Sequence, residues 1–384
     1  MEWNGLTESY LDYSATTPVC GAAAEACVTA MKRDFGNPSS LYRLGMEAEN
    51  IVSAARRTLS KALGCEEQGL FFTGSATESN NIAIFGSLAA NPRKGRKIIT
   101  TAVEHAAVLG PFTELQKRGY ETVYLMPDET GNYTARQFFD AVDDHTALVS
   151  VMLVNNEVGT RHPVEEIIRA VRQKNPDTLI HIDAVQGAFK LPFSIRTSNP
   201  DLLSVSGHKI YAPKGVGALY IRKGVKVSSL LFGGGQEKGV RPGTESVPLI
   251  AAFAAAVEWY LPQQKEFFAG YEALHEGLLE RLAEIPEVSV NSPAGGVPYI
   301  TNFSVRGVRS EIMLHFLESR GVFVSSGSAC AKGAKSHVLD ALGLSNARAD
   351  TALRVSFGAY TEQKDIDRLA DGLKEGLSSL IRTN

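Results

Sequence analysis

Four segments of this sequence place chemically capable polar side chains directly after a run of strand-forming residues. The runs are rich in aliphatic residues, which is typical of buried strands in a parallel sheet. In open α/β sheets, ligands bind at the edge where the carboxyl ends of the strands lie. The sequence therefore predicts one shared site, built from Glu104-His105, Asn155-Asn156-Glu157, Asp183-Ala184-Val185-Gln186 and Ser206-Gly207-His208-Lys209.

Lys209 and Asp183 are the residues whose surroundings most favour cofactor chemistry. Most lysines are solvated surface residues, but Lys209 follows a serine, a glycine and a histidine at a strand end. This setting favours a lysine that forms a Schiff base. A buried carboxylate such as Asp183 needs a cationic or hydrogen-bonding partner, and the pyridinium nitrogen of pyridoxal 5'-phosphate (PLP) is one. The alternative for Asp183 is a helix N-cap.

The turn from Thr73 to Asn80 could bind the phosphate group of such a cofactor. It joins an expected strand to an expected helix, so that backbone N–H groups and small hydroxyls meet at a helix start. The turn is neither a Walker A loop nor a GxGxxG dinucleotide loop. Serine and threonine also cap helices, and that is the structural alternative.

His105 and Cys330 are candidate groups for moving protons and sulfur. His105 could stack on a cofactor ring and shuttle protons, or be an ordinary polar residue at a strand end. Cys330 lies among small residues, which can hardly bury it, and the nearby Lys332 favours the thiolate. Free cysteines are more often buried and inert. We expect that structural role for Cys20, Cys27 and Cys65.

Seven strand-like runs alternate with amphipathic helical stretches between residues 69 and 221. This alternation predicts βαβ units around a largely parallel sheet. The expected strands are Gly69–Gly74, Lys97–Val103, Glu121–Met126, Ala147–Val154, Leu179–Asp183, Asp201–Ser206 and Gly217–Ile221. The expected helices include Ala106–Arg118, Ala135–Val142 and Val164–Lys174.

A long helical stretch from Val247 to Leu282, with a break near Leu261-Pro262, leads to a smaller α+β region. We expect a segment 1–14 that packs with the small domain, a large cofactor-binding domain 15–260, and a small domain 261–384 that carries Cys330. In the small domain the expected strands are Val288–Val290, Tyr299–Val305, Val322–Ser325 and Leu353–Phe357, and the expected helices are Ser310–Arg320 and Glu362–Ile381.

The composition excludes several classes of protein. The chain has 384 residues, of which 44% are hydrophobic, and a net charge of −3, so it is globular and lacks the basic footprint of a nucleic-acid binder. The segment Met1–Tyr10 does not resemble a signal peptide, and the longest apolar run is too short to span a membrane. Four cysteines without zinc spacing indicate free thiols in a reducing, cytoplasmic setting, and no metal is expected.

These motifs together resemble the cysteine desulfurases, which are PLP enzymes of the class V aminotransferase family. The resemblance runs in order from about residue 10 to 360. Nine motifs in the family's order are far more specific than any one of them. They are residues 10–18, 36–40, 76–81, 104–105, 155–160, 183–186, 206–209, 241–244 and 326–330.

The resemblance implies the fold and a role for each site residue. The fold is PLP-dependent transferase fold type I, with a mostly parallel seven-stranded sheet and a smaller α+β domain. Lys209 would bind PLP covalently and move the substrate Cα proton, while Asp183 would pair with the pyridinium nitrogen. The other implied roles are ring stacking by His105, contact with the ring hydroxyl by Gln186, phosphate binding by Ala76, Thr77, Ser206 and His208, phosphate binding by Thr244 of a second subunit, and substrate carboxylate binding by Asn156 and Arg354.

The implied reaction converts L-cysteine to L-alanine and leaves a persulfide on Cys330. Partners would be a second copy of the chain and a sulfur-acceptor protein, either an iron–sulfur scaffold or a tRNA-thiolation enzyme. Cys330 could also ligate an iron–sulfur cluster. Two alternatives stay open within enzymes: a selenocysteine lyase and another class V aminotransferase. A non-catalytic partner-binding role would predict loss of Lys209, Asp183 or Cys330, and all three are present.

Overall fold

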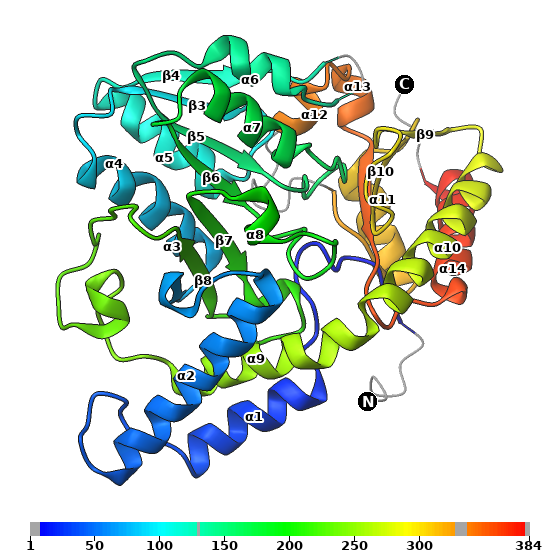
Figure 1. The fold of residues 1–384 in the computed structure, drawn as a ribbon. Helices are drawn as coiled ribbons and strands as arrows, with labels where there is room; N and C mark the ends of the chain where they lie inside the picture. Colours follow the sequence, from blue (N-terminus) through cyan, green and yellow to red (C-terminus); the bar gives the residue numbers. More distant parts are fainter. Residues whose placement is uncertain (1–7, 129–130, 327–335, 381–384) are drawn as a thin grey trace.

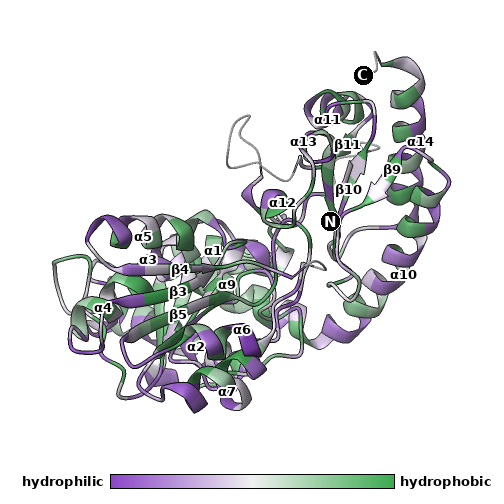
Figure 2. Ribbon diagram, turned by 90° about the horizontal axis from the view of Figure 1, so that it is seen from above, coloured by the Kyte–Doolittle hydropathy of each residue, from purple (hydrophilic) through white to green (hydrophobic). Residues whose placement is uncertain are grey.

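The protein forms two lobes, which Figures 1 and 2 show side by side. The computed structural model describes residues 8–128, 131–326 and 336–380. One lobe surrounds a seven-stranded sheet and the other surrounds a three-stranded antiparallel sheet. This is the α/β architecture expected from the sequence.

The large sheet has the strand order β2-β8-β7-β6-β5-β3-β4. Its strands are β2 (Leu70–Thr73), β3 (Lys97–Thr101), β4 (Glu121–Leu125), β5 (Thr146–Met152), β6 (Leu179–Asp183), β7 (Leu202–Ser206) and β8 (Gly217–Ile221). All seven expected strands are confirmed. Strand β8 runs antiparallel to both neighbours, because the link from β7 is too short for the crossover helix that parallel strands need.

Helices cover both faces of this sheet, so its central strands are buried on both sides. Phe112 packs with Leu148 on one face, and Phe138 and Ile167 pack with Val149 on the other. The helical elements of this lobe are α1 (Gly21–Lys32), α2 (Arg43–Leu63), η1 (Glu67–Gly69), α3 (Ala76–Asn81), the π-helix η2 (Ile82–Gly86), α4 (Ser87–Ala90), α5 (Ala106–Lys117), α6 (Ala135–Ala141), α7 (Val164–Lys174), α8 (Ile195–Ser198), η3 (Gly207–Lys209), η4 (Gln236–Gly239) and α9 (Val247–Tyr260).

The second lobe is built on the sheet β12-β10-β9. Its strands are β9 (Val288–Val290), β10 (Ile300–Val305), β11 (Val322–Phe323) and β12 (Ala352–Ser356), with β1 (Ser9–Tyr10) paired to β11. Its helices are η5 (Leu261–Gln263), α10 (Gln264–Ala283), α11 (Ser310–Ser319), α12 (His337–Ala341), α13 (Asn346–Ala349) and α14 (Gln363–Ser379). The expected strands and helices are present, and the break after α9 falls at Leu261-Pro262. The short helices α12 and α13 were not expected.

Residues 9–17, which we call the strap, connect the two lobes. Ser9 donates its hydroxyl to Asp365 Oδ1 at 2.8 Å, and the Ser14 N–H donates to Ser356 Oγ at 2.8 Å. The Thr17 N–H then donates to the backbone oxygen of His208 at 2.9 Å in the large lobe. These bonds support the expected packing of segment 1–14, of which 1–7 lie outside the described residues. The domain boundaries stay a prediction.

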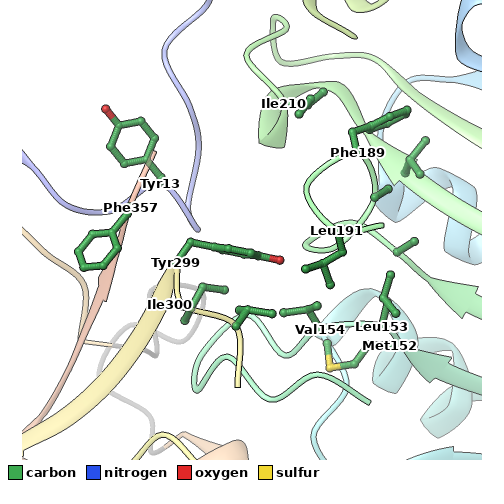
Figure 3. Packing of buried hydrophobic residues seen from close by; sticks show 14 of the residues in the cluster. Tyr13, Met152, Leu153, Val154, Phe189, Leu191, Ile210, Tyr299, Ile300 and Phe357 are labelled. Atoms are coloured by element: carbon green, nitrogen blue, oxygen red, sulfur yellow. The ribbon is translucent and has the colours of Figure 1, made fainter. Parts of the chain in front are cut away.

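A continuous hydrophobic core lies between the lobes (Figure 3). Tyr299, at the start of β10, extends towards Leu191 of the large lobe and packs beside Ile300. Its hydroxyl donates to the backbone oxygen of Gln186 at 2.9 Å. The second lobe is therefore held against the segment that follows β6, and this segment carries the predicted site residue Gln186.

Candidate active site

A cavity of about 400 Å³ lies at the carboxyl ends of the parallel strands, where the sequence predicted a shared site. It is lined from both lobes and from the strap. All predicted site residues except Thr244 and Cys330 line it: Ala76, Thr77, His105, Asn156, Asp183, Gln186, Ser206, His208, Lys209 and Arg354. The structure therefore brings these separated segments together around one cavity.

Lys209 is held at this cavity by the strap. It follows β7 in the short helix η3, and its ammonium donates to the backbone oxygens of Ser14 and Ala15, the second at 2.7 Å. The Gln186 amide also donates to Ser14 O, at 2.9 Å. The strap therefore positions both the candidate Schiff-base lysine and a candidate ring-binding amide.

Asp183, the last residue of β6, presents a buried carboxylate to the cavity. Asn80 donates its side-chain amide to Asp183 Oδ2 at 2.7 Å, and the Val185 N–H donates to Oδ1 at 3.1 Å. These bonds fix the carboxylate plane. The N-cap alternative is not supported, because the residues after Asp183 form turns and no helix.

The turn that was predicted to bind a phosphate group leads into helix α3. Ser75 is the N-cap of this helix, and its hydroxyl oxygen accepts from the Glu78 N–H at 3.2 Å. Strand β8 approaches this turn closely, since a Cβ on Gly217 would lie 3.0 Å from the Ala76 nitrogen. Ala76 and Thr77 remain at the cavity wall. Burial lowers the pKa of the nearby His208 to about 3, so its ring is neutral.

His105 is fixed by the start of helix α5. It is the N-cap of that helix, and its Nδ1 accepts from the Ala107 N–H at 3.1 Å. Burial lowers the pKa of His105 and outweighs the Asp183 carboxylate, which acts in the opposite direction, while Lys209 adds to the lowering. The ring is thus a neutral imidazole whose remaining proton is on Nε2.

Arg354, in β12, is almost fully buried at the opposite wall. Its guanidinium donates to Asn156 O at 2.9 Å and to Asp12 Oδ1 at 2.6 Å. Its Nε has no hydrogen-bond partner among the described residues. A substrate carboxylate could supply that missing acceptor, and guanidinium–carboxylate pairing is strong when bidentate.

Ser336 and His337 line the cavity but were not identified from the sequence. Ser336 donates to Glu157 Oε2 at 2.5 Å, and His337 Nε2 lies 2.9 Å from the backbone oxygen of Glu104. Burial raises the pKa of the Glu104 carboxyl to about 8. The sequence showed the pairs Glu104-His105 and Asn156-Glu157 at strand ends. It could not show their contacts with residues 336 and 337, because these contacts join segments that are far apart in the chain.

Two predicted residues are not placed in this cavity. Thr244 is exposed and does not line it, which is compatible with the expected role across a subunit boundary. Cys330 lies outside the described residues. The other cysteines are free thiols at the expected positions, with Cys20 and Cys27 at helix α1 and Cys65 after α2.

The residues of the cavity fit PLP. Asp183 supplies a buried anion for a pyridinium, and Lys209 supplies an amine. Gln186 Oε1 is buried with no hydrogen-bond partner within residues 8–128, 131–326 and 336–380, so it can accept from a ring hydroxyl. In the same ranges, no group of three metal-binding side chains is found, and no helix is long and apolar enough to cross a membrane.

Comparisons with known proteins agree with this geometry. The family model for aminotransferase class-V matches residues 9–369. The chain belongs to the class V aminotransferase family and, within it, to the PLP-dependent cysteine desulfurases.

Individual relatives cover nearly the whole chain. Cysteine desulfurase IscS of Clostridium botulinum is 41% identical over 95% of this chain and 93% of its own. The IscS of Methanosarcina thermophila is 38% identical, over 97% of this chain and 92% of its own. Among solved structures, a NifS-like protein superimposes with a TM-score of 0.93 at 36% identity, over 97% of this chain and 100% of its own. The structure of SspA in complex with cysteine gives 0.82 at 33% identity, over 92% of this chain and 100% of its own.

Proposed function

We propose that this chain converts L-cysteine to L-alanine and transfers the sulfur to Cys330 as a persulfide. The observation that carries this proposal is the convergence of Lys209, Asp183 and Arg354 on one cavity. Lysine and aspartate match the aldehyde and the ring nitrogen of PLP. The arginine, opposite them, matches the carboxylate of an amino acid.

The contacts of the cavity residues suggest a separate role for each of them in the reaction. PLP, when bound, supplies an electron sink that lets the Cα–H and Cβ–S bonds of the substrate break. Arg354 and Asn156 hold the substrate carboxylate, which orients Cα towards Lys209. Lys209 removes the Cα proton. Asp183, whose plane is fixed by Asn80, keeps the ring nitrogen protonated.

The flanks of the segment that carries Cys330 support its role as sulfur acceptor. Before the segment, Ser325 pairs with the backbone of Arg354, whose N–H donates to Ser325 O at 2.6 Å. After it, Ser336 lines the cavity and bonds to Glu157. The described flanks Ser325 and Ser336 are therefore both held by residues of the substrate site. In the proposed reaction the Cys330 thiolate is the nucleophile for the substrate sulfur.

The homodimer and the downstream acceptor are part of the same proposal. Leu41 and Phe232 are 94% and 97% exposed, which is unusual for large apolar side chains and favours burial against a second copy. Thr244 would reach the partner's phosphate site from there. The persulfide would pass to an iron–sulfur scaffold or a tRNA-thiolation enzyme. The free thiols support a cytoplasmic location.

The test is to supply the purified protein with L-cysteine and a reductant and to quantify alanine, with Cys330→Ala alongside. We expect alanine from the wild type and almost none from the variant, which should still bind cysteine and change colour. Cys27→Ala is the matched control and should behave as the wild type. Equal alanine from the wild type and Cys330→Ala would overturn the persulfide step.

A further inference from the structure

The imidazoles of His105, His208 and His337 line the cavity. His208 Nδ1 lies 3.2 Å from the Thr16 hydroxyl, and burial lowers the pKa of this ring to about 3. The hydrogen bonds of His105 and His337 leave a different ring nitrogen free in each. Nδ1 of His105 is already used, since it accepts from the Ala107 N–H at 3.1 Å. An imidazole with that lone pair occupied has its proton on Nε2 and can only donate. His105 could gain a second proton only by turning an N–H of its own towards that of Ala107. It is therefore poorly suited to take up a proton.

His337 has the complementary arrangement. Its Nε2 lies 2.9 Å from the backbone oxygen of Glu104, and because a carbonyl can only accept, Nε2 must carry the proton. The lone pair is then on Nδ1, which has no hydrogen bond from any described residue. His337 is also exposed to solvent while its ring lines the cavity. It can therefore exchange protons with water.

We propose that His337 is the catalytic base of this cavity and that its Nδ1 takes the proton of the substrate thiol, while His105 acts as a neutral donor and stacking residue. The proposal rests on the proposed function, since it needs L-cysteine as substrate. It assigns the sulfur step to a residue of α12, and leaves the Cα proton to Lys209.

The proton transfer balances within the cavity. The S–H bond breaks, its electron pair stays on sulfur, and the proton forms the second N–H of the His337 ring. The Glu104 carbonyl keeps its hydrogen bond to Nε2, and the nearby Glu157 carboxyl favours the resulting positive charge. When sulfur leaves to Cys330, the carbon that it leaves needs one proton to become a methyl group. The His337 imidazolium can return that proton.

Charged groups around this ring come from several elements. Glu157 follows β5, and Lys209 and His105 end or follow strands of the large sheet, while Arg354 lies in β12. Electrostatic interaction links His337 with both His105 and Glu157. A change in activity with pH could therefore arise from any of these groups. For this reason the test uses variants and isotope exchange instead of a pH profile.

The decisive variant is His337→Gln. The glutamine amide can occupy the place of Nε2 and still donate to the Glu104 oxygen, but it has no lone pair comparable to that of Nδ1. We expect the kcat for alanine formation from L-cysteine to fall by about 100-fold, within the range of general acid–base catalysis. The half-saturating cysteine concentration should change less than about threefold. His337→Ala should lose as much activity, and the exposed His315→Gln should lose none.

A second measurement separates the sulfur step from the Cα step. Exchange of the Cα proton of L-alanine for deuterium in heavy water needs Lys209 but involves no thiol. In His337→Gln this exchange should stay within about threefold of the wild type. A parallel fall in exchange and desulfuration would overturn the proposal, as would a His337→Gln kcat close to that of the wild type.

The tautomers can be tested without any turnover. In protein labelled with ¹⁵N-histidine, long-range proton–nitrogen spectra should show His105 and His337 each with the proton on Nε2. The two signals are assigned by their loss in His105→Asn and His337→Gln. A proton on Nδ1 of His337 would overturn the proposal even in an active enzyme. A wild type that makes no alanine from cysteine would instead remove the proposed function, and this proposal with it, while the tautomers stay measurable.

Discussion

The two walls of the cavity are built in different ways. One wall consists of strand ends and a helix start of the large sheet, which place Asp183, Lys209 and His105. The other wall brings together segments distant in the chain, and its Arg354–Asp12 contact joins residues 342 positions apart. The backbone of the first wall is fixed by the sheet, and the strap then holds the Lys209 ammonium. The second exists only when the lobes and the strap are packed together.

Because of this difference, the two walls contribute different groups to the site. The strand-end wall holds the groups for the cofactor and for the Cα proton, Asp183 and Lys209, and buried strands give them little freedom. The second wall holds the group that binds the substrate carboxylate, through hydrogen bonds between lobes such as those from Ser336 and Arg354. Substitutions of Asp183 or Lys209 should therefore abolish the reaction, and substitutions of Arg354 should weaken binding. The second wall also carries His337, the proposed base for the substrate thiol.

Lys209→Ala is the substitution with the largest expected effect, and it breaks the strand-end wall. Removing the amine deletes both covalent cofactor attachment and the base for the Cα proton, so alanine formation should fall by at least about 1000-fold. The thermal unfolding midpoint of the apoprotein should stay close to that of the wild type. Residual turnover near the wild-type rate would show that another group does this work.

Arg354→Gln tests the second wall and should have an intermediate effect. Losing a charge-assisted hydrogen-bonded pair costs about 1.5–3 kcal/mol, which corresponds to a rise of about 10- to 150-fold in KM for L-cysteine. The kcat should fall much less, because Arg354 binds the substrate carboxylate and itself takes up no proton. Steady-state kinetics decide this. A fall in kcat alone would mean that Arg354 does not act by binding the substrate carboxylate.

Glu104→Gln sharpens the comparison through stability and leaves the groups that bind the cofactor and substrate in place. Burial raises the pKa of this carboxyl to about 8, above its ordinary value of 4.5. Below the ordinary value both folded and unfolded chains are protonated. As the pH rises through this window, the unfolded chain loses the proton first, so the wild type loses stability by on the order of 1 kcal/mol per pH unit. The glutamine variant should lack this loss.

Denaturant unfolding at several pH values checks the expectation for Glu104. The difference in unfolding free energy between Glu104→Gln and the wild type should shift in favour of the variant from about pH 5 to about pH 8. Glu311→Gln, on the surface helix α11, is a suitable control. A difference that does not change with pH would mean that Glu104 is ionised in the folded protein.

The strand-end wall could be predicted from the sequence, and the second wall only in part. Strand ends such as the one before Asp183 are marked by a buried run followed by polar residues, and parallel topology brings these ends together. Arg354 entered through family resemblance alone. Asp12 and His337 left no local signal, because α12 has only five residues and the strap contacts depend on packing between lobes. The antiparallel direction of β8 depends on the short link between β7 and β8, and the hydrophobic periodicity of the sequence does not indicate strand direction.

The most direct test of this account is to map the sulfur after a single exposure of the holoenzyme to L-cysteine. The protein would be alkylated, digested and analysed by mass spectrometry, which distinguishes the peptides of the four cysteines. The account predicts one additional sulfur atom on Cys330, formed in step with alanine and greatly reduced in Lys209→Ala. Alanine without added sulfur on Cys330, or sulfur on Cys20, Cys27 or Cys65 instead, would contradict it.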